Sequence, residues 1–382
     1  MLYLKKLRQL STLSSVLLCF SMAVSLGTAT SSAAKAKQLK QTNVQIEELE
    51  PPANSVDESI DFYNSIVRVI QNMPSNGQPR DISVEDNNSQ RLSEQQLNDS
   101  LEVYQIIGRL LKEGKLSPSA YSALPFIQDF NLPFYQGTLV AIAETNLAAI
   151  PEEQLIASNA CLEIAKEGEE ITNLRMEAGV GTRIDILIAR YLRRHCQIQR
   201  LELEIAQSDI ELESLQESID LAESKSEIAE ARQNPKVPDF LANYYINNIE
   251  LLQKLNSQGK SLEIQTDDSV LQRLYKQQLN DALDLYRLVG IRLGTGIMGD
   301  ESRIGMIVLP AVLISLAEVN LATEPNGQEL AARTCLEIAQ AWKEYISPTE
   351  EVTSETDVEA LNADYWKKQC DIRKLQTDKL QP

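Results

Sequence analysis

Apolar residues recur at every seventh position along the stretch from Thr182 to about Arg232, which contains neither glycine nor proline. The recurring positions are Ile184, Tyr191, Ile198, Ile205, Leu212 and Ile219, with Leu187, Leu201, Leu215 and Ala222 on a partner stripe. Glu, Gln and Lys fill most other positions, as on a solvated helix face. This period predicts a coiled-coil-like helix, about 75 Å long if it runs unbroken.

A second helix-patterned segment precedes it, from Pro151 to Met176. Its facing stripe consists of Ala157, Ile164, Ile171 and Leu174. Between the two segments, Gly179 and Gly181 can adopt the backbone conformations that end a helix, and Thr182 can cap the next one. The pattern predicts an antiparallel hairpin with its tip at these residues.

The chain also matches itself. "RLSEQQLNDSLEVYQIIG" from Arg91 matches "RLYKQQLNDALDLYRLVG" from Arg273 at an offset of 182 residues. "LVAIAETNLA" from Leu139 matches "LISLAEVNLA" from Leu313 at an offset of 174, so the first copy carries eight extra residues between the two segments. The sequence is therefore an internal duplication.

The cysteines follow the duplication, because Cys161 corresponds to Cys335 and Cys196 to Cys370. Each copy holds one pair, separated by 35 residues and centred on a predicted turn, "EAGVG" or "SPTEEVTSETD". In a hairpin, the two cysteines of a pair lie at one level, each about 25 Å from the turn. This predicts the disulfides Cys161–Cys196 and Cys335–Cys370, and the alternative is two free core thiols per copy.

The predicted fold is all-α, with two tandem copies of an antiparallel, coiled-coil-like helical hairpin unit, each stapled by a disulfide. The predicted segments are a signal peptide at 1–35, a disordered segment at 36–57, repeat 1 at 58–232, a linker at 233–239 and repeat 2 at 240–382. The apolar run "IGMIVLPAVLISLA" at 304–317 is too short for a membrane span, which predicts a buried core helix.

The N-terminus has a basic start, an apolar centre from about Val16 to Leu26 and a tail of small residues. These three parts are typical of a secretory signal peptide, cleaved between Ala29 and Ala36; a single-pass anchor is the alternative. Cys19 does not indicate a lipoprotein, because a large leucine precedes it and the apolar run continues past it. The cysteine pairs agree with export to an oxidising compartment.

Charge excludes some partners. The 382 residues carry a net charge of −19, which disfavours nucleic acid and electrostatic docking to anionic lipid. The predicted protein partners are envelope proteins or further copies of this chain, and membrane association is left open.

The sequence predicts that the protein is not an enzyme and has no cofactor and no metal site. His195 is the single histidine and has no further ligands at helical spacing, and its neighbour Cys196 points in a different direction on a helix. The G-x-G-x-x-G match at 294–299 follows a helix rather than a strand, which predicts a loop. The acidic clusters at 166–170 and 267–268 lack the spacing of a dedicated calcium loop, which predicts solvated charge.

The hairpin tip resembles a known family. "EAGVGTRIDILIARYLRRHCQIQRLELE" is similar to the segment of TolC-like outer-membrane efflux proteins in which glycine, threonine and aspartate precede a long helix, with alanine four residues after the aspartate. The matching residues here are Gly181, Thr182, Asp185 and Ala189. "NLPFYQG" at 131–137 resembles the family's entry into its periplasmic helix. The second copy retains "SETDV", with Asp357 near the corresponding place, slipped by two residues against the cysteine alignment and without the glycine.

The resemblance implies a trimeric channel, with strands in the outer membrane and a periplasmic helical tunnel whose polar tips meet an inner-membrane adaptor. Arg183 and Asp185 would be its tip residues. Two functions are therefore expected for an exported, non-enzymatic protein of the bacterial cell envelope, in the periplasm or outer membrane. One is a TolC-like export component, and the other is a soluble periplasmic or secreted scaffold or binding protein.

Overall fold

The computed structural model describes residues 55–83, 86–114, 132–179, 182–207, 239–294, 304–346 and 354–379. The predicted signal peptide, Cys19 and residues 233–238 of the predicted linker lie outside these ranges, as do the rest of the predicted long helix after Gln207 and all but Gly294 of the 294–299 loop. Asp239, the last residue of the predicted linker, instead begins a helix.

Ten helices and no strand occupy the described ranges, which confirms the all-α class. The first copy contains α3 (Ser55–Gln71), α4 (Asn88–Lys112), α5 (Leu132–Leu147), α6 (Pro151–Glu177) and α7 (Arg183–Gln207). The second contains α8 (Asp239–Leu252), α9 (Val270–Gly294), α10 (Ile304–Leu321), α11 (Pro325–Ile346) and α12 (Ser354–Asp378). Within the described residues each copy thus contains five helices, and the predicted hairpin forms the last two. Helix α3 begins three residues before the predicted start of repeat 1.

Both predicted disulfides are present. Cys161 in α6 is joined to Cys196 in α7, and Cys335 in α11 is joined to Cys370 in α12, with a Cα–Cα distance of 5.5 Å in each pair. All four cysteines are completely buried. The prediction for Leu174 was wrong, because its side chain is 57% exposed near the end of α6 rather than buried between the helices.

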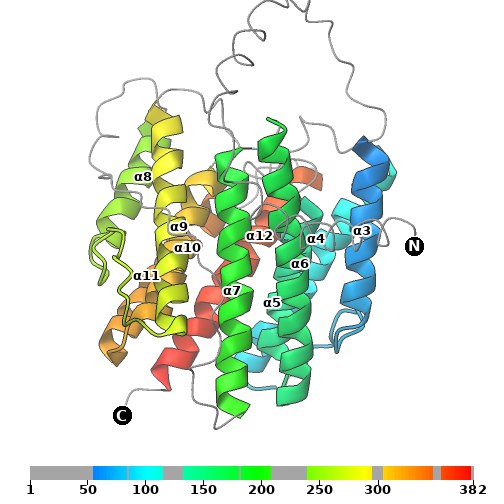
Figure 1. Cartoon of the computed structure of the whole chain (residues 1–382), viewed down its shortest axis with the longest axis horizontal. Coiled ribbons are helices and arrows are strands. Elements are labelled where there is room, and N and C mark those ends of the chain that lie inside the picture. Colours follow the sequence, from blue (N-terminus) through cyan, green and yellow to red (C-terminus); the bar gives the residue numbers. More distant parts are fainter. Residues whose placement is uncertain are drawn as a thin grey trace, which may run out of the picture. The chain divides into compact units, whose positions relative to one another are not determined.

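The last helix of each copy packs on the other copy. In Figure 1, α7 lies beside α6 of its own hairpin and also against α9, and α12 packs against both α11 and α4. The hydroxyl of Tyr191 in α7 donates to the backbone carbonyl of Leu313 in α10 at 3.0 Å. The equivalent Tyr365 in α12 donates to Leu139 in α5, also at 3.0 Å. The seven-residue stripe of α7 therefore serves the partner copy as well as its own hairpin.

Ion pairs repeat this reciprocal arrangement. Arg194 of α7 pairs with Asp281 of α9, and the equivalent Lys368 of α12 pairs with Asp99 of α4. Buried apolar residues of both copies belong to one continuous core. The two copies are therefore interlocked, and neither buries its own core without the other.

Within each copy the same tyrosine contact holds the first two helices together. Tyr63 and Tyr104 stack with their ring centroids 4.6 Å apart, as do Tyr245 and Tyr286. The hydroxyl of Tyr104 donates to the backbone carbonyl of Tyr63 at 2.9 Å, and Tyr286 donates to Tyr245 at 2.8 Å. Gly108 makes room for this contact, because a Cβ there would collide with the Tyr63 ring.

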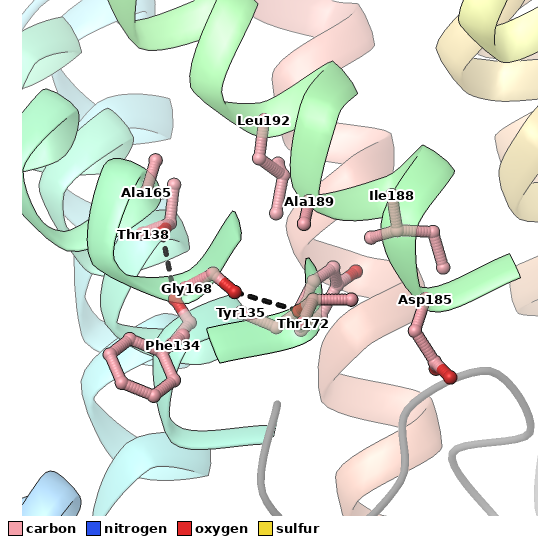
Figure 2. Close-up of a pocket in the computed structure, with 10 residues that line it drawn as sticks. All are labelled: Phe134, Tyr135, Thr138, Ala165, Gly168, Thr172, Asp185, Ile188, Ala189 and Leu192. Carbon is pink, nitrogen blue, oxygen red and sulfur yellow. Dashed lines mark hydrogen bonds between the residues drawn. The ribbon is translucent and has the colours of Figure 1, made fainter. Parts of the chain in front are cut away.

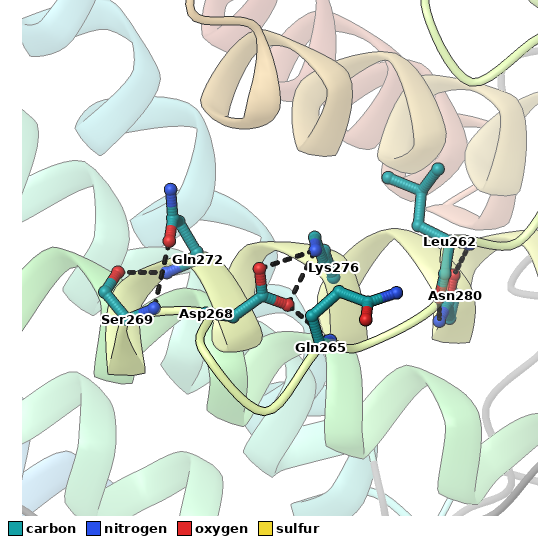
Figure 3. Close-up of polar contacts among 7 residues, drawn as sticks. All are labelled: Leu262, Gln265, Asp268, Ser269, Gln272, Lys276 and Asn280. Carbon is teal, nitrogen blue, oxygen red and sulfur yellow. Dashed lines mark hydrogen bonds and ion pairs between the residues drawn. The ribbon is translucent and has the colours of Figure 1, made fainter.

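An asparagine fixes the loop before the second helix of each copy. Asn98 accepts from the backbone N–H of Arg80 at 2.7 Å and donates to its carbonyl at 2.9 Å, and Asn280 does the same with Leu262 at 2.8 and 2.9 Å. Figure 3 shows the second copy, where the Asp268 carboxylate also accepts from the backbone N–H of residue 265 at 2.8 Å. These bonds satisfy loop backbone groups that no ladder or helix would pair.

The apolar segment at 304–317 forms the core helix that its composition predicts. Nearly every residue of α10 is buried, including Pro310 inside the helix. Among the described helices, α10 is the one with the length and composition to cross a membrane, and 89% of it is covered by the rest of the protein.

Candidate functional site

The tip of the first hairpin ends α6 and starts α7 with separate devices. After the last residue of α6, the backbone N–H of Ala178 donates to Leu174 at 3.0 Å. Gly179 follows with φ +75°, the left-handed conformation that glycine adopts without steric cost. Its N–H donates to Met176 at 3.0 Å. This confirms the predicted role of Gly179, while Gly181 lies outside the described residues.

Thr182 and Asp185 cap the start of α7 reciprocally. The Asp185 carboxylate accepts from the Thr182 backbone N–H at 2.9 Å and from its hydroxyl at 2.6 Å. The Thr182 hydroxyl oxygen accepts from the Asp185 backbone N–H at 3.3 Å. This is a capping box with aspartate in place of glutamate, and its negative charge also favours the helix N-terminus.

The other predicted tip residues are arranged differently. The Arg183 side chain is exposed in the first turn of α7, whereas Asp185 is 4% exposed. Asp357 lies in the first turn of α12, but the offset of 174 that relates the disulfides places it opposite Arg183. The residue equivalent to Asp185 is Glu359, so Asp357 lies two positions before that place, which is the slip that the cysteine alignment predicts.

A pocket lies between α5, α6 and α7, with Asp185 in one wall (Figure 2). It is lined by Phe134, Tyr135 and Thr138 from α5, by Ala165, Gly168 and Thr172 from α6, and by Asp185, Ile188, Ala189 and Leu192 from α7. The two threonine hydroxyls donate to helix carbonyls, Thr138 to Phe134 and Thr172 to Gly168, each at 2.7 Å. The pocket therefore presents a mainly apolar wall.

The pocket is small and open on one side. It spans about 360 Å³ including its mouth, and about 30 Å³ of this admits the centres of water molecules. A single water needs roughly 10–15 Å³ by the second measure. The pocket thus has room for two or three waters.

The second copy carries a large buried side chain at one of the positions equivalent to the pocket lining. Trp342 stands where the first copy has Gly168, and its indole is 3% exposed. The neighbours of that indole are Gly305 and Glu359, since a Cβ added to Gly305 would lie 2.9 Å from the Trp342 ring and 3.1 Å from a Glu359 oxygen. Trp342 and Glu359 therefore lie close together in the second copy, at the positions equivalent to Gly168 and Asp185, which line the pocket of the first.

Burial dominates the titration of Glu359. It raises the pKa of the carboxyl to about 7, although the Trp342 indole N–H and the Gly305 backbone N–H favour the charged form. A carboxyl in this environment changes charge near neutral pH.

His195 is a buried residue whose ring nitrogen has a side-chain partner in α9. It is 5% exposed, and its Nδ1 lies 3.2 Å from the Gln278 amide nitrogen in α9. Burial, together with the charge of Arg373, lowers the pKa of His195 to about 3, so the imidazole is neutral at pH 7 and can accept from that amide. The equivalent residue in α12 is Gln369, whose oxygen accepts from Gln96 at 2.7 Å.

In the part of the chain that the structure describes, no group of three or more histidine, cysteine or acidic residues is placed to hold a metal ion. No family model, curated protein or solved structure matches the chain.

Sequence reasoning found the hairpin tip but missed the pocket. The signal was present in the duplication, because the 174-residue offset sets Gly168 against Trp342. A glycine opposite a tryptophan changes side-chain volume more than any other exchange in these helices. The sequence does not show that Gly168 and Trp342 both lie near the start of the next helix, and without that knowledge the exchange does not predict a pocket.

Proposed function

We propose that this chain is an exported, non-enzymatic helical protein of the bacterial cell envelope that works by binding, in the periplasm or after secretion. The observation that carries the proposal is the pocket of the first copy, which is lined by Gly168 where the second copy carries the buried Trp342. Two copies that share their interlocking contacts have diverged at one concave, mainly apolar place. Such places are where small ligands bind.

The cysteines support the proposed compartment. Two fully buried disulfides are typical of proteins that fold where thiols are oxidised. Together with the predicted signal peptide, they support export. The net charge of −19 keeps such a protein soluble and disfavours adsorption to anionic lipid.

The second candidate is an export component of the TolC-like kind. The tip sequence favours it, and the exposed Arg183 at the start of α7 is accessible to a partner protein. The buried Asp185 is already engaged in capping, which favours a structural role for that residue. The binding-protein proposal is therefore favoured, because it needs no role for Asp185 beyond capping α7.

Envelope fractionation of cells that produce the full chain at native level distinguishes the two. The binding protein is expected in the osmotic-shock or culture fluid, and as a monomer or dimer by light scattering. Recovery in the outer-membrane pellet after salt and carbonate washes, with release by detergent as a trimer, would overturn it in favour of the export component. Retention in the cytoplasm with reduced cysteines would overturn both.

A further inference from the structure

We propose that the surfaces by which the two copies hold each other select unlike partners, so that a first copy pairs with a second copy and not with another first copy. The partner that this surface fits is therefore a copy of the opposite kind. The inference goes beyond the proposed binding function and does not depend on it. It comes from comparing the interlocking contacts in the two directions across the duplication.

Some of the interlocking contacts would form in either kind of pairing. The hydroxyls of Tyr191 and Tyr365 donate to backbone carbonyls of the other copy at 3.0 Å, and both copies offer such a carbonyl. Both last helices carry a basic residue, Arg194 or Lys368, that pairs with an aspartate on the second helix of the other copy. Since both copies have these groups, the groups attract a like copy as well as an unlike one.

A buried amide pair occurs in one direction across the interlock and not in the other. The side-chain amide of Gln136 in α5 donates to the side-chain oxygen of Asn362 in α12 at 3.0 Å, and both residues are buried. The 174-residue offset sets Pro310 against Gln136 and Ile188 against Asn362. Pro310 and Ile188 are buried as well, but neither side chain carries a hydrogen-bonding group. Positions that are polar in one direction are thus apolar in the other.

A tyrosine and a tryptophan on the same two helices follow the same pattern. The indole N–H of Trp366 in α12 donates to the hydroxyl of Tyr135 in α5 at 3.1 Å, and both side chains are buried. The equivalent residues are Leu192 in α7 and Leu309 in α10, which are buried and apolar. The first copy therefore carries the polar groups of this contact on α5, and the second copy carries their partners on α12.

Pairing of like copies would leave these polar groups without partners. Two first copies would set the Gln136 amide against Ile188, although the oxygen of that amide already has no hydrogen-bond partner among the described residues. Two second copies would set Asn362 against Pro310, and the Trp366 indole would lose its acceptor. A buried polar group without a partner destabilises an interface, whereas unlike copies satisfy the polar pairs in one direction and match apolar groups in the other. Like pairings are therefore disfavoured.

Carbodiimide cross-linking of the oxidised full-length protein, followed by peptide mapping, reports which copies pair, because the reagent joins an amine to a carboxylate in contact with it. Lys368 pairs with Asp99 of the first copy in the structure. Between two second copies, Lys368 would instead meet Asp281, the equivalent of Asp99. For the wild type, refolded from urea at high concentration, we expect the product that joins Lys368 to Asp99 and none that joins Lys368 to Asp281.

Moving the polar partner from α12 to α7 should reverse the choice. The double variant Ile188→Asn with Asn362→Ile gives Gln136 a partner in a like copy and none in the unlike copy. It should refold into dimers or larger assemblies by sedimentation, with the product joining Lys368 to Asp281 at least about tenfold above the wild type. The matched control, Gln136→Leu with Asn362→Ile, buries no unpaired amide in either pairing. It should keep the wild-type product, because copies linked in one chain meet at high effective concentration.

Urea titration keeps the proposal testable if the variant with the moved partner does not fold. Asn362→Ile alone leaves the Gln136 amide without its partner and should lower the folding equilibrium constant about tenfold, and adding Gln136→Leu should recover most of that loss. The proposal is overturned if the folded variant with the moved partner gives the wild-type cross-links, or if the wild type itself joins Lys368 to Asp281 between chains. It is also overturned if Asn362→Ile alone is as stable as the matched control.

Discussion

The two copies of this chain keep the same tyrosine and ionic contacts where they hold each other and differ at the tips of their hairpins. Tyrosine hydroxyls reach the partner copy in both directions at 3.0 Å, and basic residues of α7 and α12 pair with aspartates of α9 and α4. Near the tips, the first copy has Gly168 and an open pocket, whereas the second copy has the buried Trp342 at the position equivalent to Gly168. The shared contacts constrain both copies equally, whereas the tips were free to diverge.

An ion pair between the two helices of each hairpin has its charges exchanged between the copies. In the first hairpin, Glu169 of α6 pairs with Arg190 of α7 at 3.5 Å. At the equivalent positions Lys343 of α11 pairs with Asp364 of α12 at 2.5 Å, with the signs exchanged. The two positions carry opposite charges in both copies, but the acidic residue lies on the first helix in one hairpin and on the second helix in the other. This is expected of a partly exposed ion pair, which contributes little to the free energy of unfolding.

The largest expected effect on stability comes from giving the second copy the glycine that the first copy has at the equivalent position. Trp342→Gly removes a buried indole and adds a glycine inside α11, which should lower the free energy of unfolding by about 4–6 kcal/mol in urea titrations. Indole in excess should restore part of the loss by binding the new cavity. Glu337→Gly, at an exposed position of the same helix, should cost only about 1 kcal/mol. Equal losses in the two variants would show that the indole is not a core group.

The two disulfides should contribute equally to the free energy of unfolding. Replacing Cys161 and Cys196 together by alanine, or Cys335 and Cys370 together, should lower stability by about 4 kcal/mol in each case, because each bond closes a loop of 35 residues. Denaturant midpoints of the two double variants under non-reducing conditions measure this. A twofold or larger difference between them would contradict the equivalence of the hairpins.

Glu359 should make the second copy sensitive to pH. Its folded pKa of about 7 exceeds the unfolded value of 4.5, so the folded state holds a proton that the unfolded state releases. The contribution is present below pH 4.5 and is lost as the pH rises through 7, by about 3 kcal/mol. Glu359→Gln should remove this fall when the two proteins are compared from pH 4.5 to 8, and the exposed Glu337→Gln should not. An unchanged pH slope in Glu359→Gln would refute the role of this carboxyl.

His195 should act in the opposite direction and more weakly. Its folded pKa of about 3 lies below the unfolded value of 6.5, so the unfolded state takes up a proton first as the pH falls. Stability is complete above pH 6.5 and should be lower by about 2 kcal/mol at pH 5. His195→Gln, which copies Gln369 of the other half, should reduce that loss. Identical acid unfolding curves for the two proteins would count against a buried neutral histidine.

Much of the fold could be predicted because the duplication supplied a second observation of each element. The pairing Cys161–Cys196 followed from symmetry about a turn, and its counterpart repeated the argument. The interlock could not be predicted in this way. An apolar stripe such as that of α7 shows that a face is buried, but not whether its partner belongs to the same copy, so Tyr191 gave no indication that it reaches Leu313.

The candidate site was predictable only in its outline. Gly179 and Thr182 identify a hairpin tip because their backbone and capping preferences are local. Asp357 lies two positions away from the equivalent of Asp185, because the short tip motif and the offset that the cysteines set align the second copy differently. The pocket depends on how closely α5 approaches Gly168, which is a property of packing and is not visible in residue spacing.

The central claim is that the interlocked copies form one cooperative unit, and native-state hydrogen exchange of Trp342→Gly tests it most directly. The substitution lies in the second copy, whereas the buried core of α4, around Leu97 and Leu101, lies in the first. The account predicts that the most protected amides of α4 and of α9 lose the same opening free energy, about 4–6 kcal/mol. Wild-type protection in α4 together with loss confined to α8–α12 would contradict it.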